Sequence, residues 1–143
     1  MRYIKSCGFV VYSSIDGEDR YLIIKSNNGD VGFPKGHREA GESELETALR
    51  ELSEEVSLEV NVVEGFRREI RYKLSIDHDA VKQAVYFLGH CKDTGKLKRQ
   101  ESEVADARFV SLDEAMSALS FEDTRRILSD ADQHIKKNAL SKI

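Results

Sequence analysis

An acidic segment at residues 36–58, GHREAGESELETALRELSEEVSL, is the most informative part of this chain. Glu51, Glu54 and Glu55, called here the carboxylate triad, stand at positions i, i+3 and i+4, so a helix places all three on one face. The apolar residues form a separate stripe about 120° round the axis: Leu45, Ala48, Leu49, Leu52 and Val56. The segment therefore predicts an amphipathic helix with one buried face and one face of carboxylate oxygens.

The acidic face has two competing explanations. Like charges at these spacings cost a few tenths of a kcal/mol per pair, so they need either open water or a cation. A glutamate-rich helix is most often a solvated surface. Residues 44–56, however, hold five Glu against the single base Arg50, a net charge of −4 that equals that of the whole chain. This imbalance favours a bound cation, and Mg²⁺ or Mn²⁺ are the candidates because both take carboxylate ligands.

Composition limits the class of protein. The 143 residues, 40% hydrophobic and 34% charged, are expected to form one domain over 1–143. A net charge of −4 and a pI near 5.6 argue against an extended nucleic-acid surface. Cys7 and Cys91 lack metal-ligand spacing and are too few for a disulfide scaffold, which favours a reducing, cytoplasmic location. No apolar run approaches a membrane span, and the chain is expected to be a monomer.

Periodicity and turn residues predict an α+β layered domain. Ser43 and Glu46 fit a capping box, so the acidic helix should begin near Glu44 and end near Val56 or Ser57. Residues 13–19 are expected to form a hairpin loop, and 96–105 a polar loop. The predicted strands are 4–12, 20–24, 60–66, 67–74, 81–91 and 108–110, and the further helices 112–119 and 121–137.

The spacing of the acidic segment resembles the signature of the Nudix hydrolases, which cleave nucleoside diphosphates linked to another moiety. The matching pattern is Gly36, five residues, Glu42, seven residues, then Arg50-Glu51-Leu52-x-Glu54-Glu55-x-x-Leu58. The chain departs from it at Ser57, where the family usually has a glycine that ends the helix in a left-handed turn. The resemblance implies an α/β/α sandwich with a central mixed, partly barrel-like β-sheet.

The resemblance also implies roles in metal binding and catalysis. The carboxylate triad would hold the metal, with Glu51 a ligand or base, and Arg50 would orient its glutamate neighbour; a surface ion pair predicts nearly the same structure for this arginine. Gly36 is placed at the metal, where a close backbone approach leaves no room for Cβ. Family members often add a glutamate from the loop before a late strand. Here that loop holds Glu101 and Glu103, and alignment against the strand favours Glu103. For each of them, a solvated acid in a polar loop is the alternative.

A closer resemblance concerns the substrate. FPKGH at residues 33–37, together with segments across most of 4–115, resembles the asymmetric diadenosine tetraphosphate hydrolases of the animal and archaeal type, which use water to release ATP and AMP. Basic residues would hold phosphates, with a solvated strand face as the alternative. Tyrosines would stack on a base, with core packing as the alternative. The candidate substrate-binding residues are Lys35, His37, Arg67, Arg71, Lys73, Tyr72, Lys82 and Tyr86.

Two other functions are compatible with the same helix. One is another Nudix activity, on RNA 5′ ends or diphosphoinositol polyphosphates, which needs only a change in the basic and aromatic residues around 73–86. The other is a non-catalytic nucleotide sensor, which the intact carboxylate triad disfavours.

Overall fold

The computed structural model describes residues 2–73 and 80–141, with side chains described for 4–71 and 80–139. The strands are β1 Arg2–Ile15, β2 Glu18–Ser26, β3 Val31–Gly32, β4 Lys35–His37, β5 Asn61–Lys73, β6 Ala80–His90 and β7 Val104–Val110. The helices are α1 Glu44–Val56, α2 Leu112–Ala118 and α3 Glu122–Ser141, with one 3₁₀ turn, η1 Thr94–Lys96. No helix within these described ranges is both long and apolar enough to cross a membrane.

Strand β1 is the centre of a mixed sheet. It pairs parallel with β6 along its length, from Arg2 opposite Ala80 to Tyr12 opposite His90. Its other edge pairs antiparallel with β4 and then with β2. The sheet order is β3-β2-β1-β6-β5, with β4 attached to β1 and β7 to β2. One edge of β1 is therefore shared between β4 and β2. The chain leaves β4 next to β1 and continues into α1.

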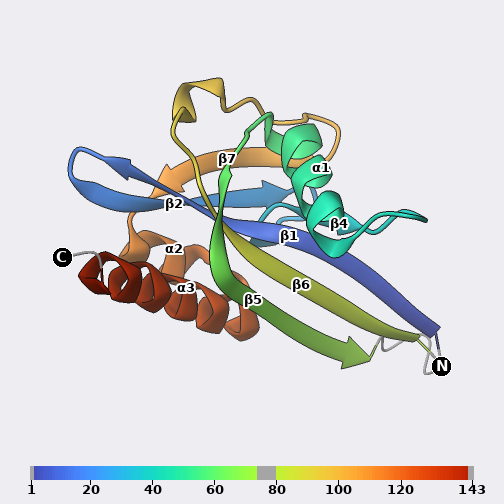
Figure 1. The fold of residues 1–143 in the computed structure, drawn as a ribbon. Helices are drawn as coiled ribbons and strands as arrows, with labels where there is room; N and C mark the ends of the chain where they lie inside the picture. Colours follow the sequence, from blue (N-terminus) through green and yellow to red (C-terminus); the bar gives the residue numbers. More distant parts are fainter. Residues whose placement is uncertain (1, 74–79, 142–143) are drawn as a thin grey trace.

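Helices cover both faces of this sheet (Figure 1). Alternation along β1 sends Cys7, Phe9 and Val11 into a core beneath α1, and Val10 into a second core on the face covered by α2 and α3. Leu52 of α1 is buried in the first core, and Leu128 of α3 in the second. The predicted α+β class and its three-layer α/β/α arrangement are therefore confirmed.

Helix α1 begins and ends where the sequence predicts. The Ser43 side chain accepts a hydrogen bond from the Glu46 amide, and the Glu46 carboxylate accepts one from the Ser43 amide, which completes the capping box. Ser57 ends the helix in the left-handed conformation, at φ 59° and ψ 29°. Serine thus takes the backbone geometry for which glycine is usually chosen.

Three predicted boundaries are wrong. The loop at 13–19 shrinks to Asp16 and Gly17, both with positive φ, because a tight hairpin turn lets the strands extend on either side. In place of two segments, 60–66 and 67–74, the described residues form the single strand β5, Asn61–Lys73, with a register shift at the bulge around Gly65. The polar loop 96–105 is shorter than predicted, since η1 includes Lys96 and β7 begins at Val104.

Candidate active site

The last turn of α1 carries a buried carboxyl group. Glu55 is only 5% exposed, because α1 lays this side of its last turn against the sheet and the loop before β7. Burial, then the nearby charge of Glu51, a hydrogen bond shared with Glu51 and the charge of Glu103 together raise the pKa of Glu55 to about 8. In the absence of a cation, Glu55 is therefore largely protonated at neutral pH.

Gly36 makes room for the second carboxyl group. It lies in β4 opposite Cys7 of β1, so its backbone position is fixed by the sheet. A Cβ at Gly36 would lie 2.0 Å from the carboxyl carbon of Glu51. Glycine is therefore required here for a Glu51 side chain to reach the space next to Glu55.

Arg50 organises the outer side of the acidic face. Its guanidinium donates to both oxygens of Glu42, at 2.7 and 3.0 Å, and to the backbone oxygen of His37 at 3.0 Å. It also donates to Glu51 at 2.9 Å and to Glu54 at 3.2 Å. The hydrogen bonds from Arg50 hold the pKa of Glu42 well below its usual range, at about 2. Arg50 thus fixes Glu51 from one side while Gly36 leaves it space on the other.

The carboxylate triad does not form a closed metal site in this structure. Across the parts of the chain that are described, no three His, Cys, Asp or Glu side chains are grouped closely enough to hold a metal ion. Glu54 is half exposed and turns to Arg50, whereas Glu55 is buried against Glu51. The carboxyl oxygens nevertheless suit a hard divalent cation. A metal ion can displace the proton of Glu55 and would then bind two adjacent carboxylates.

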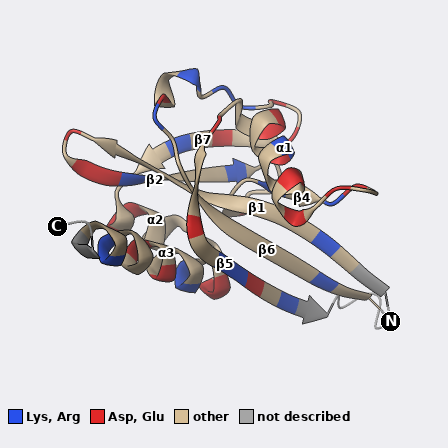
Figure 2. Ribbon diagram, in the orientation of Figure 1, with Lys and Arg blue, Asp and Glu red and all other residues tan. Residues whose placement is uncertain are grey.

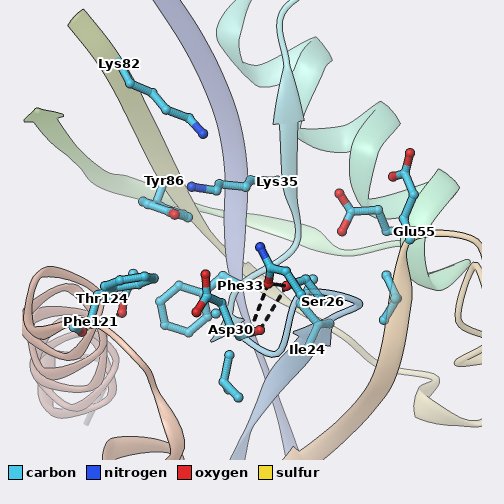
Figure 3. A pocket seen from close by; sticks show the side chains of 15 residues that line it. Ile24, Ser26, Asp30, Phe33, Lys35, Glu55, Lys82, Tyr86, Phe121 and Thr124 are labelled. Carbon is cyan, nitrogen blue, oxygen red and sulfur yellow. Dashed lines mark hydrogen bonds between the residues drawn. The ribbon is translucent and has the colours of Figure 1, made fainter. Parts of the chain in front are cut away.

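A pocket of about 390 Å³ opens next to these acids (Figure 3). Glu55 lies on one side of its lining and Phe121 and Thr124 on the other. The pocket is also lined by Lys35, Lys82, Tyr86 and Glu103. Of the predicted site residues, the structure therefore brings five into one pocket: Lys35, Glu55, Lys82, Tyr86 and Glu103.

Two lysines give the pocket a positive wall. The ammonium groups of Lys35 on β4 and Lys82 on β6 point toward the same space above Tyr86 (Figure 3). Burial, followed by the charge of Lys82, lowers the pKa of Lys35 to about 8, while Glu55 acts in the opposite direction. A polyanion placed between the two ammonium groups would relieve this repulsion. The geometry therefore suits a phosphate chain.

The other predicted basic residues lie outside the pocket. Arg67 donates to both oxygens of Glu44 at 2.9 Å, and Arg71 donates to Glu69 at 2.7 Å. Acidic and basic residues alternate along this part of β5, so the charges there compensate one another (Figure 2). His37 is exposed on β4.

The side chains of Tyr72 and Lys73 lie outside the described residues; their backbones pair with Lys82 and Val81.

The exposed aromatic surface of the pocket comes from Phe121, whereas Tyr86 takes the alternative role of core packing. Tyr86 is only 1% exposed and meets the edge of Phe33 at a ring distance of 5.7 Å, so it packs mainly in the core. Phe121, which the sequence does not single out, is 55% exposed and lines the pocket just before α3. Asp30 and Thr124 line it as well. Asp30 precedes β3, whereas Phe121 precedes α3 and Thr124 lies in α3, so the packing of α3 on the sheet brings them to one site.

Comparison with known proteins identifies the family. A family model described as "NUDIX domain" matches residues 7–131. The bis(5′-nucleosyl)-tetraphosphatase [asymmetrical] of Sus scrofa is 31% identical over 143 residues, covering 92% of this chain and 95% of that protein. Its Rattus norvegicus counterpart is 32% identical over 149 residues with the same coverage. The solved structure of a C. elegans Ap4A hydrolase binary complex matches the fold with a TM-score of 0.85 at 19% identity, covering 94% of this chain and 98% of that one. The chain therefore belongs to the Nudix family.

Proposed function

We propose that this chain hydrolyses dinucleoside tetraphosphates, with diadenosine tetraphosphate converted to ATP and AMP. The observation that carries the proposal is the single pocket in which a buried carboxyl group, two facing ammonium groups and an exposed aromatic ring meet. The substrate has a matching part for each of them: a scissile phosphate, a polyphosphate chain and a base. Relatives that cover nearly the whole chain are named for this activity, which supports the same choice.

The carboxylate triad, Glu103 and the backbone at Gly36 would hold the divalent cation, for which Mg²⁺ is proposed. When bound, the cation neutralises charge on the phosphates and lowers the pKa of an attacking water. Arg50 keeps Glu51 in place through the hydrogen bond of 2.9 Å. Water attacks phosphorus, the phosphoanhydride bond breaks, and a carboxylate of this group accepts the proton of the water.

The rest of the substrate would be held by the pocket's other walls. Lys35 and Lys82 bind the phosphate oxygens as point charges, away from the bond that breaks. Phe121 offers its exposed face to a base, a contact worth about 1–3 kcal/mol. Arg67 and Arg71 are not assigned to the phosphates, because each already pairs with a carboxylate.

A turnover panel tests this proposal. Purified chain with Mg²⁺ is given diadenosine tetraphosphate, triphosphorylated RNA and a diphosphoinositol polyphosphate, and the products are separated by ion-exchange chromatography. We expect ATP and AMP in equal amounts from the first substrate, and ¹⁸O from labelled water in one of the two products. A preference for either of the other substrates, or no turnover of the dinucleotide, would contradict the proposed substrate.

A further inference from the structure

The loop that carries Glu103 is tied down at both of its ends. On one side, the backbone amides of Lys98 and Gln100 donate to the oxygens of Val56 and Glu55 at the end of α1, at 3.0 and 2.7 Å. On the other side, the loop meets the turn between β2 and β3. Glu103 itself is exposed, so its position depends on how this loop is held.

Asn27, in the turn between β2 and β3, makes the second attachment. Its side-chain amide donates to the backbone oxygen of Ser102 at 2.7 Å, and its backbone amide donates to the backbone oxygen of Glu103 at 3.3 Å. Asn27 therefore donates hydrogen bonds to two consecutive carbonyl groups, one on each side of the Glu103 Cα. Asn27 itself does not line the substrate pocket, although its neighbours Ser26 and Asn28 do.

A β-bulge directs the chain at the same place. In the pairing of β2 with β7, Lys25 is opposite Asp106 and Ser26 is opposite Val104, which leaves Ala105 as an extra residue. Such bulges bend a strand and turn a neighbouring side chain in a new direction. Here the bulge buries Val104 and leaves Glu103 at the pocket rim. The bulge and Asn27 act on the same few residues.

We propose that Asn27 is a positioning residue that holds the Glu103 loop against the end of α1, so that the Glu103 carboxylate stays at the pocket that Glu55 also lines. This role rests on the proposed function, because it acts through the catalytic contribution of Glu103. The turn between β2 and β3 would thus support catalysis through Asn27, whose contacts are with the backbone of the Glu103 loop.

The test compares Asn27→Asp, Glu103→Gln and the double variant. Asn27→Asp keeps the shape of the side chain but replaces the donor to Ser102 by an acceptor, which repels that carbonyl oxygen. We expect kcat to fall about 10-fold with KM changed less than twofold, and no further fall when the change is made in Glu103→Gln. Ser102→Ala is the matched control, since it keeps the accepting carbonyl and should leave kcat unchanged.

Hydrogen exchange of residues 100–104 gives a second measurement that needs no turnover. We expect faster exchange in Asn27→Asp than in the wild type or in Ser102→Ala, with the melting temperature little changed. Unchanged exchange, additive losses of kcat, or a fully active Glu103→Gln variant would each overturn the inference. If the wild type fails to cleave dinucleotides, the proposed function fails, and exchange alone decides whether Asn27 restrains the loop.

Discussion

The buried carboxyl of Glu55 should make the stability of the metal-free protein depend on pH. Its pKa is about 8 in the folded chain against 4.5 for an ordinary glutamate, so folding favours the protonated form. Below pH 4.5 the group is protonated in both the folded and the unfolded state, so folding buries no charge at Glu55. As the pH rises from 4.5 to about 8, the folded state must either keep a proton that the unfolded state releases or bury a charge. Stability is therefore lost across this window.

The size of the effect follows from the shift of the pKa. A change from 4.5 to about 8 corresponds to about 5 kcal/mol in total, at about 1.4 kcal/mol for each pH unit. This is an upper limit, because part of the raised pKa of Glu55 comes from the neighbouring charge and hydrogen bond of Glu51 and not from burial alone. Glu55→Gln keeps the shape and a hydrogen-bond donor but cannot ionise. We expect this variant to be more stable than the metal-free wild type at pH 8 by several kcal/mol, and to match it near pH 5.

Urea unfolding of EDTA-treated protein between pH 5 and pH 8.5 measures this difference directly. Every other titratable group is present in both proteins, so its contribution cancels when one curve is subtracted from the other. Saturating Mg²⁺ should stabilise the wild type and narrow the gap, because the metal binds only the ionised carboxylates. A difference that stays constant with pH would refute the argument that Glu55 is buried in its protonated form.

Four other substitutions probe different parts of the site. Gly36→Ala should lower kcat about 100-fold and cost less than about 2 kcal/mol of stability, because its Cβ displaces the flexible end of Glu51; denaturation and steady-state kinetics separate the two. Arg50→Lys should lose about 1–3 kcal/mol in urea unfolding, since an ammonium cannot replace the forked contacts. Phe121→Ala should raise KM for the dinucleotide about 10-fold at nearly constant kcat and stability, whereas Phe121→Leu should lose less. Tyr86→Ala should instead destabilise the protein by about 3–5 kcal/mol, and an unchanged melting temperature would contradict its place in the core.

Features that depend on neighbouring residues could be predicted from the sequence. Helix α1 was delimited correctly because Ser43 and Glu46 form a local cap and the apolar stripe repeats with the helical period. Lys82 could be placed on the same strand face as Tyr86 because side chains alternate along β6. Glu55 was identified by the spacing of the signature. Its burial, however, depends on where the sheet and the β7 loop lie.

Features that depend on tertiary partners could not be predicted. Arg67 was assigned to phosphate, but its carboxylate partner Glu44 lies 23 residues away on another element. Phe121 precedes α3 in a sequence that suggests only a helix start, and it reaches the pocket because α3 packs across the sheet. In each case a distant partner determines the role of the side chain.

The parallel pairing of β1 with β6 has a consequence for how the protein is made. Ser13 at the end of β1 bonds to the oxygen of Cys91, 78 residues later in the chain. At about 5–20 residues per second, a ribosome needs several seconds to synthesise that interval. During this time the apolar β1 has no β6 to pair with, so the nascent chain exposes an unpaired strand edge that chaperones can bind. The acidic helix is therefore synthesised early, but the sheet on which it packs is completed only after β6 and β7 have been synthesised.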